Sequence, residues 1–206
     1  MSKKTCEKGT LLVVSGPSGV GKGTVLAELM KKSSDYAYSV SVTTRAPREG
    51  EIEGVNYFFR TKEEFEQMIE NGELLEYASY NGNYYGTPKK YVDKMLASGK
   101  NVILEIEVQG AMKVKKLRPD AVMVFIAPES KDVLSERLSI RATEPKDVII
   151  NRIEIAEREL RACPFYDYVT VNSDGKAEKC AEDIMAAVRA EKLKPKKMFG
   201  LISEFI

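Results

Sequence analysis

The chain has 206 residues, which is enough for one globular domain with small insertions. Its 32 lysine and arginine residues balance 31 aspartate and glutamate residues, and the net charge of +1 argues against a nucleic-acid backbone as the main partner. It has no histidine, which excludes Ser-His-Asp hydrolysis and histidine-ligated zinc and leaves carboxylates, lysine, arginine and backbone amides for chemistry.

The three cysteines, Cys6, Cys163 and Cys180, are scattered without metal-ligand or redox spacing. This pattern indicates reduced thiols and a cytoplasmic protein. The longest apolar run, at residues 121–127, is far too short to span a bilayer. We therefore expect neither a membrane nor a nucleic acid as partner, and the sequence does not indicate an oligomeric state.

Short apolar runs alternate with helix-compatible segments along the chain. Buried strands are predicted at residues 10–14, 102–108, 122–127 and 168–171. Helices are predicted at residues 24–32, 61–72, 87–99, 145–160 and 177–188. Thr61 and Glu64 form a capping box for the second helix, and Thr87 with Pro88 has the N-cap and N1 character that begins the third. The alternation predicts an α/β fold with a parallel sheet flanked by helices.

Two segments interrupt this alternation. Residues 39–86 are rich in threonine, arginine, glycine, asparagine and tyrosine, and in places they alternate as an antiparallel sheet does. We interpret them as an inserted substrate subdomain. Residues 136–147 are polar and carry arginines, which favours a second, smaller and mobile insert.

A phosphate-binding loop follows the first strand and opens the first helix. Its residues have the spacing G-x-x-x-x-G-K and are Gly16, Pro17, Ser18, Gly19, Val20, Gly21 and Lys22, followed by Gly23 and Thr24. The glycines let the backbone wrap closely so that N–H groups point at phosphate oxygens, and the helix N-terminus adds its positive dipole end. Lys22 supplies a charge for the β- and γ-phosphates. The usual hydroxyl residue after the lysine is replaced by Gly23, and the hydroxyl comes one position later, in Thr24.

Arginines and tyrosines of the first insert suit the binding of a monophosphate. Arg45 and Arg48 lie three residues apart in a segment with few carboxylates, close to Tyr57 and upstream of Tyr85. Guanidinium forks and phenol hydroxyls together form a clamp for a phosphate dianion. The alternative is that both arginines are solvated surface side chains.

Two carboxylates, Glu105 and Glu107, are predicted to share one face of the strand at residues 102–108. Carboxylates inside an α/β core are costly unless they are paired, hydrogen-bonded or near a cation. This pattern favours a site at the end of that strand, and a salt bridge to a core-facing lysine is the alternative.

Four ordered motifs make the chain resemble the guanylate kinase family from about Gly9 to Val188. They are SVSVTTRAPREGEIEGVNYFF at residues 39–59, GNYYGT at 82–87, ILEIEVQG at 103–110, and a set of arginines at 137, 141 and 152 followed by YDYVTVN at 166–172. The Gly-Lys-Gly-Thr variant of the loop also occurs in nucleoside monophosphate kinases, where the metal is held mostly through phosphates and water. The resemblance implies transfer of the γ-phosphoryl group of ATP to GMP, with Mg²⁺ accompanying ATP.

The resemblance also implies an architecture. This is a P-loop kinase with a parallel core sheet flanked by helices, an inserted mixed α/β GMP-binding subdomain and a small helical lid. The implied boundaries are residues 1–38, 97–134 and 157–206 for the core, 39–96 for the GMP-binding subdomain, and 135–156 for the lid.

Individual roles are implied in the same way. The ATP-binding residues are those of the loop at 16–24 together with Asn172, which borders adenine. The catalytic residues, which neutralise phosphate charge, are Lys22, Arg45, Arg137, Arg141 and Arg152. The GMP-binding residues are Ser41, Arg45, Arg48, Glu51, Tyr57, Glu76, Tyr85, Thr87 and Glu107.

For the base, the resemblance implies that Glu76 accepts hydrogen bonds from guanine N1–H and the 2-amino group, while Ser41 and Thr87 offer hydroxyls to O6. Glu105 is implied to contact Mg²⁺ through water. Glu107 stands where the family usually has aspartate, and Ala142 where glycine is commoner. For Glu76 an exposed charge, and for Thr87 a helix N-cap, are the alternatives.

Other functions stay open at this point. Guanylate-kinase-like domains of some scaffolding proteins bind partners without catalysis, but these typically have a damaged phosphate loop, whereas Lys22 and the arginines are present here. A kinase for another monophosphate is a second alternative. A P-loop GTPase is disfavoured because no guanine-reading Asn-Lys-x-Asp segment is present.

Overall fold

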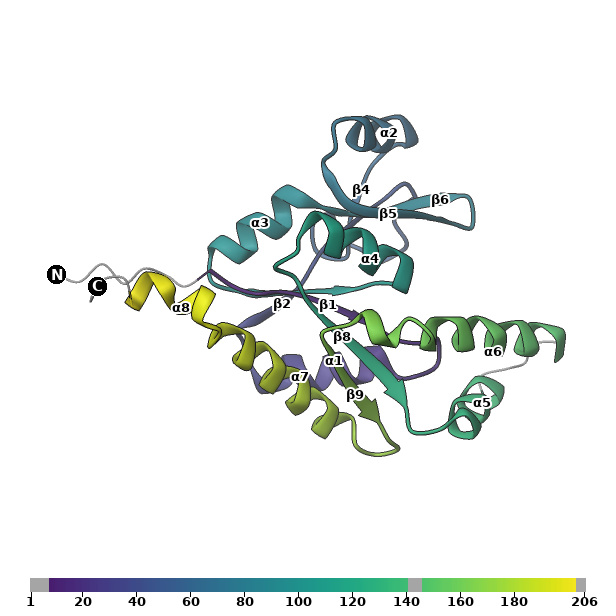
Figure 1. Cartoon of the computed structure of the whole chain (residues 1–206). Coiled ribbons are helices and arrows are strands. Elements are labelled where there is room, and N and C mark those ends of the chain that lie inside the picture. The colour runs from purple at the N-terminus through teal and green to yellow at the C-terminus, as the bar shows by residue number, and fades with distance from the viewer. Residues whose placement is uncertain (1–7, 141–145, 203–206) are drawn as a thin grey trace. The chain divides into compact units, whose positions relative to one another are not determined.

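The computed structural model describes residues 8–140 and 146–202, and the chain divides into two compact units. Unit 1 contains Asp35–Ala121 together with the chain up to Leu11. Unit 2 contains Leu12–Ser34 and the chain from Val122 onward. Both units combine helices with strands (Figure 1), as the alternation of apolar runs predicted.

Unit 2 is built on parallel strands. Strand β1 (Leu11–Ser15) pairs with β8 (Val122–Pro128), which in turn pairs with β9 (Tyr168–Asn172). Every residue of β1 and most of β8 are buried, which is typical of strands covered on both faces. The helices of this unit are α1 (Lys22–Lys32), α5 (Lys131–Ile140), α6 (Lys146–Leu160), α7 (Ala177–Lys192) and α8 (Pro195–Ile202), with a 3-10 turn at Cys163–Phe165. The prediction of a parallel α/β sheet is confirmed.

Helices α1 and α7 pack against each other through apolar side chains that recur at helical spacing. Leu26 and Leu29 of α1 and Ile184 of α7 are fully buried. At the rim of this contact, Lys32 Nζ donates to Glu178 at 2.6 Å and to Glu182 at 2.9 Å. The packing joins the helix that follows the phosphate-binding loop to the last long helix of the chain.

Unit 1 contains a four-stranded sheet in the order β4-β3-β6-β5. The strands are β3 (Ser41–Thr43), β4 (Tyr57–Phe59), β5 (Leu74–Tyr80) and β6 (Asn83–Pro88). The β3–β4 pair is parallel, whereas β6 runs antiparallel to both β3 and β5. Strands β5 and β6 are joined by Asn81 and Gly82, whose φ angles of 47° and 74° suit a two-residue hairpin turn with left-handed backbone. The predicted insert therefore has a sheet of its own, which is mixed rather than purely antiparallel.

The rest of unit 1 consists of a parallel strand pair and three helices. Strand β2 (Tyr36–Tyr38) pairs in parallel with β7 (Asn101–Glu105), and the helices are α2 (Lys62–Glu70), α3 (Lys89–Ala97) and α4 (Val108–Leu117). The capping box of α2 is confirmed. Glu64 N–H donates to Thr61 Oγ1 at 3.1 Å, and Thr61 N–H donates to the Glu64 carboxylate at 2.7 Å. Buried Val42, Phe65 and Leu74 form the core between the sheet and α2.

Two sequence-based predictions in unit 1 are wrong. The strand predicted at residues 102–108 ends at Glu105, and α4 begins at Val108, because the continuous buried run of the strand gives way to the helical spacing of buried Ala111 and Val114. Thr87 does not cap α3. It is the penultimate residue of β6, and Pro88 occupies the N-cap position.

In the part of the chain that the structure covers, no helix is both long enough and apolar enough to cross a membrane. Cys163 and Cys180 are free thiols, and Cys6 lies outside the described residues. The division into core, GMP-binding subdomain and lid stays a prediction.

Candidate functional site

The loop between β1 and α1 in unit 2 wraps tightly before the helix begins. Gly21 takes the N-cap position of α1 with φ 89°, a left-handed conformation that glycine adopts without a steric penalty. Among the described residues, no side chain caps the first turn of α1. The N–H groups at the start of this helix are therefore left for a ligand or for water, as in an anion-binding helix terminus.

The Lys22 side chain folds back over this loop. Its ammonium donates to the carbonyl oxygen of Gly16 at 2.6 Å and to that of Pro17 at 3.3 Å. The side chain is half-buried, so the charge is held beside the loop rather than extended into solvent. A lysine held in this way can add its charge to the backbone N–H groups when a phosphate binds.

A cavity of about 590 Å³ lies in unit 2 beside the loop. Its lining includes Gly21, Thr24, Arg137, Asn172 and Asp174. Thr24 is exposed here, which leaves its hydroxyl accessible to a ligand. This cavity brings the loop together with two further residues predicted from the sequence, Arg137 and Asn172.

Asn172 is buried at the end of β9, and its two amide atoms differ in their contacts. Nδ2 donates to the carbonyl oxygen of Val20 at 2.7 Å, which ties β9 to the loop. Oδ1 is buried and has no hydrogen-bond partner among the described residues. A buried acceptor without a partner carries a desolvation cost that a ligand donor can relieve.

Arg137, in the last turn of α5, is held against the same loop. Its guanidinium donates to the carbonyl oxygen of Val20 at 3.2 Å and to that of Asn172 at 3.1 Å. Nε also donates to Asp174 Oδ1 at 3.1 Å, and a second bond joins the guanidinium to the same carboxylate. Four hydrogen bonds thus fix one arginine at the edge of the cavity.

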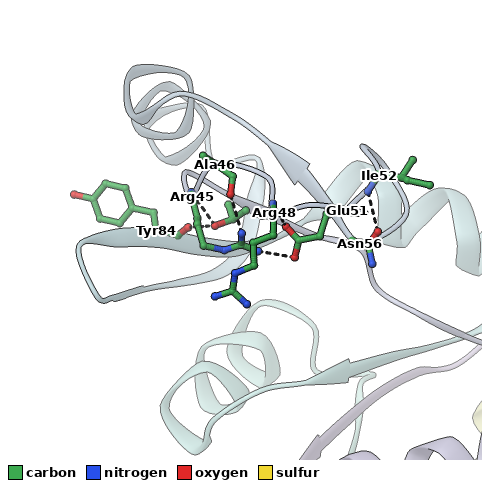
Figure 2. A network of polar contacts seen from close by, with 8 residues as sticks. Arg45, Ala46, Arg48, Glu51, Ile52, Asn56 and Tyr84 are labelled. Carbon is green, nitrogen blue, oxygen red and sulfur yellow. Dashed lines mark hydrogen bonds and ion pairs between the residues drawn. The ribbon is translucent and has the colours of Figure 1, made fainter.

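In unit 1 the predicted clamp is organised around one half-buried ion pair (Figure 2). Arg45 NH2 donates to Glu51 Oε1 at 2.8 Å, and both side chains are less than one fifth exposed. Glu51 Oε2 accepts from the backbone N–H of Arg48 at 2.7 Å. The ion pair raises the pKa of Arg45 and, together with the Arg48 N–H, lowers the pKa of Glu51.

Aromatic rings complete the clamp. The Arg45 guanidinium carbon lies 5.4 Å from the centroid of the Tyr57 ring, which is cation–π distance. The Tyr85 ring meets the Tyr57 ring edge-on at 6.1 Å, and its hydroxyl contributes to the raised pKa of Arg45. Arg48 is exposed, and its guanidinium points away from Glu51 in Figure 2. The structure therefore groups Arg45, Glu51, Tyr57 and Tyr85, with Arg48 at the edge.

Glu76, in the middle of β5, is 9% exposed. Its Oε1 accepts a hydrogen bond of 2.6 Å from Thr87 Oγ1 on the neighbouring strand β6. Burial raises the pKa of Glu76, and the bond from Thr87 and the charge of Lys113 partly offset this rise. The alternative that Glu76 is an exposed charge is thereby wrong.

The other carboxylate oxygen of Glu76 faces Gly110 on α4. A β-carbon at position 110 would lie 3.3 Å from Glu76 Oε2, which is a tight contact. Glycine at this position avoids crowding the carboxylate. Thr87 also lines a cavity of about 400 Å³, together with Ser41, Tyr57 and Glu105. This second cavity is contained in unit 1 and carries hydroxyls on its walls.

The two strand carboxylates are not placed as predicted. Glu105 is the last residue of β7 and is exposed, and Glu107 is exposed at the N-cap of α4, so they do not share a face of one buried strand. The chain turns from strand to helix between them. Glu107 is still near enough to Glu76 to add to the rise in its pKa. Arg141, Ala142 and the side chain of Arg152 lie outside the described residues.

Sequence reasoning missed two residues of these sites. Asp174, which holds Arg137, lies just beyond β9, at the strand end where loops of parallel sheets carry ligand contacts. Gly110 belongs to one of the quoted motifs, but its closeness to Glu76 depends on the packing of α4 against β5. Asp167 of the last motif accepts from the backbone N–H of Met123 at 2.8 Å, which supports the β8–β9 contact rather than a site.

Comparison with known proteins gives consistent matches. A family model described as guanylate kinase matches residues 8–191. The chain is 50% identical over 200 residues to a guanylate kinase of Shouchella clausii, covering 97% of each chain. It is 53% identical over 185 residues to a guanylate kinase of Bacillus cereus, covering 89% of each. Among solved structures it is similar to a guanylate kinase from Anaplasma phagocytophilum, with a TM-score of 0.68, 37% identity, and coverage of 91% of this chain and 88% of that one.

Proposed function

The chain belongs to the guanylate kinase family, and we infer that it acts as a guanylate kinase, transferring the γ-phosphoryl group of ATP to GMP to give ADP and GDP. Phosphoryl transfer needs positioning and charge neutralisation more than covalent chemistry. The acceptor phosphate of GMP is already anionic, so the reaction needs no general base. We propose a donor site in unit 2 and an acceptor site in unit 1.

ATP binds at the loop of unit 2. The backbone N–H groups of residues 16–24 and the start of α1 receive the phosphates, and Lys22 swings from the Gly16 carbonyl to the β- and γ-phosphates. Arg137 neutralises charge that develops on the transferring group, and Arg141 and Arg152 join it. The unpaired Asn172 Oδ1 supports a further role, since it can accept a hydrogen bond from the 6-amino group of adenine.

GMP binds in unit 1. Arg45, Arg48, Tyr57 and Tyr85 hold its phosphate, and Glu51 keeps Arg45 in place through the half-buried ion pair. The observation that carries the guanine assignment is the buried Glu76–Thr87 pair beside a cavity of about 400 Å³.

The Glu76 carboxylate accepts from guanine N1–H and the 2-amino group, and the hydroxyls of Ser41 and Thr87 face O6. Adenine presents a lone pair at N1 to Glu76, so recognition includes a repulsive term against AMP. Glu107 is the next candidate for reading guanine.

Mg²⁺ accompanies ATP in this reaction. Within the described residues no group of three or more cysteine, aspartate or glutamate side chains is placed to hold a metal ion. Glu105 is exposed, and its carboxylate would contact the water shell of the ion. This fits a magnesium ion held mainly by phosphates and water, which is how this ion usually binds in nucleotide sites. When bound, the ion neutralises charge on the β- and γ-phosphates.

A steady-state assay with ATP and a panel of GMP, dGMP, AMP and UMP tests the proposal. Coupled ADP release should be fastest with GMP, and a preference for AMP or UMP would overturn the guanine assignment. No ADP release with any acceptor would instead favour a binding domain of the scaffolding type. The balanced composition and free thiols support action in the cytoplasm, with ATP and GMP as partners.

A further inference from the structure

Unit 1 contains another cavity besides the one of about 400 Å³. It has a volume of about 600 Å³ and lies among β4, α2 and α3. We refer to it as the rear cavity. The 400 Å³ cavity is lined by Ser41, Tyr57 and Thr87, among others. The rear cavity is lined by the residue that follows each of them in its strand, namely Val42, Phe58 and Pro88. Side chains of successive strand residues point to opposite faces of a sheet. The rear cavity therefore lies behind the proposed GMP site, on the other face of the same three strands.

The floor of the rear cavity is aromatic and apolar. The rings of Phe58 and Tyr91 meet edge-on, with centroids 5.5 Å apart. Met68 lies beside them, and Phe58 and Met68 both pack on the core cluster of Val42 and Phe65. None of Phe58, Met68 and Tyr91 is fully buried, so each leaves apolar surface accessible in the cavity. Such a floor suits a flat ring that can contact the two aromatic side chains.

The rim of the rear cavity is basic. Four cationic side chains line it against one carboxylate, that of Glu73, and the cations are Arg60, Lys89, Lys90 and Lys94. Arg60 is already paired with Glu53 at 2.9 Å, and Lys89 donates to the carbonyl oxygen of Gly72. Lys90 and Lys94, in contrast, are exposed and form no ion pair among the described residues.

The positions of these lysines on α3 are electrostatically unfavourable in the absence of an anion. Lys90 and Lys94 are four residues apart, where like charges on a helix repel. Lys89 and Lys90 also stand in the first turn, which contains no acidic residue, although the positive end of the helix dipole lies there. A bound anion would reduce both the repulsion between Lys90 and Lys94 and the repulsion between the lysines and the positive end of the helix dipole.

We propose that the rear cavity binds a small aromatic phosphate, with its ring on Phe58 and Tyr91 and its phosphate between Lys90 and Lys94. The volume suits a drug-sized ligand of this kind. Because the cavity and the proposed GMP site lie on opposite faces of β3, β4 and β6, the ligand does not compete for the GMP site. This site is separate from both substrates of the proposed reaction.

Isothermal titration of the full chain with 1-naphthyl phosphate tests the proposal. We expect one molecule bound per chain when saturating GMP and ADP occupy the two proposed nucleotide sites. In the double variant Lys90→Glu, Lys94→Glu the affinity should fall by about 10-fold or more, because two charge-assisted contacts are lost. Both lysines are exposed, so the fold should be retained, and GMP turnover without the probe should be unchanged.

Two control experiments separate the contribution of the Tyr91 ring to binding from that of the lysine charges. The double variant Lys31→Glu, Lys179→Glu changes the net charge equally at exposed helix positions of unit 2 and should bind the probe as the wild type does. Tyr91→Leu keeps an apolar side chain but removes the ring. This variant should bind the aromatic phosphate more weakly and bind inorganic phosphate as the wild type does.

Four results would overturn the proposal: no binding by the wild type, displacement of the probe by GMP, equal affinity in the Lys90 and Lys94 variant, or equal affinity for inorganic phosphate. None of these measurements depends on catalysis. Failure of the rear cavity is therefore distinguishable from failure of the guanylate kinase assignment.

Discussion

The proposed donor site in unit 2 and the proposed acceptor site in unit 1 are built to bind phosphate by different means. The donor loop presents backbone N–H groups at the start of α1, and even the side chains around it, Lys22, Arg137 and Asn172, are anchored on loop carbonyl oxygens. The acceptor site presents side chains that are fixed by other side chains, such as Arg45 by Glu51. A backbone cradle depends on few side chains, here mainly Lys22, whereas a side-chain clamp shares its function among several partners. The two sites should therefore respond differently to mutation.

The largest effect is expected at the donor loop. Lys22→Ala removes the mobile charge that stabilises the transferring phosphoryl group, and kcat should fall on the order of 10²-fold or more. The KM for GMP should change little, because the proposed GMP site is in the other unit. Lys31→Ala, an exposed lysine on the same helix, is the matched control and should keep full activity. Near-normal turnover of Lys22→Ala in the coupled assay would remove Lys22 from the catalytic residues.

At the acceptor site, Glu76→Gln keeps the shape of the side chain but turns one acceptor oxygen into a donor. One guanine donor then meets a donor, and an unpaired buried polar group costs roughly 1–3 kcal/mol, or about a 5- to 150-fold fall in kcat/KM for GMP. Activity with AMP should hold or rise. Glu66→Gln, on the exposed surface of α2, serves as the control. If the Glu76 variant keeps full preference for GMP, guanine is read elsewhere, with Glu107 tested next.

Glu51→Gln tests whether the clamp depends on its ion pair. The amide can still accept from the Arg48 N–H, but it no longer offers a charge to Arg45. A charge-assisted hydrogen bond is roughly twice as strong as a neutral one, so kcat/KM for GMP should fall by about 10-fold. Glu49→Gln, two residues away and exposed, should behave as the wild type. Equal kinetics of the two variants would argue that Arg45 needs no positioning.

The pH dependence of the acceptor site follows from the burial of Glu76. Because burial raises its pKa, native protein holds this proton to a higher pH than the unfolded chain does. The favourable contribution of this group to stability is therefore complete below the ordinary carboxyl pKa and is lost as the pH rises through the raised value. GMP binding should have the opposite pH dependence to stability, because only the ionised carboxylate accepts both hydrogen bonds from guanine. The KM for GMP should therefore rise as the pH falls.

Thermal unfolding of Glu76→Gln across the acidic range separates these effects. The variant should be more stable than the wild type at neutral pH, with Tm rising roughly 2–4 °C for each kcal/mol of ionisation cost removed. The difference should vanish in acid, and the pH dependence of the KM for GMP should flatten. A variant that is equally stable at every pH would show that the buried carboxylate costs nothing.

The smallest effect is expected for Asp174→Asn, because Asp174 is 81% exposed and Arg137 keeps its two carbonyl contacts. Exposed ion pairs contribute little, so kcat should fall on the order of 5-fold or less. The loss should be in kcat rather than in the KM for GMP, and high salt should bring wild type and variant together. A larger loss, matching Arg137→Ala, would mean that the carboxylate has its own contact with a substrate.

The amino-acid sequence by itself determined the features that depend on neighbouring residues. The phosphate loop follows from seven consecutive residues between a buried strand and a helix, and the Thr61–Glu64 capping box joins residues three apart. Both were predicted because backbone geometry and local hydrogen bonds are sufficient for them. The alternation of apolar runs and helical segments likewise predicted the parallel α/β core.

Only the tertiary structure decided the contacts that give the sites their chemistry. Thr87 had the residue type of a helix cap, and it became a partner of Glu76 because β5 and β6 pair as a hairpin that buries both side chains. The bond between Arg137 and Asp174 joins residues 37 positions apart. The strand predicted at residues 102–108 ended three residues early, at Glu105, because α4 packs on β5. Burial, pKa and partner choice depend on which distant segments meet, and no local pattern carries that information.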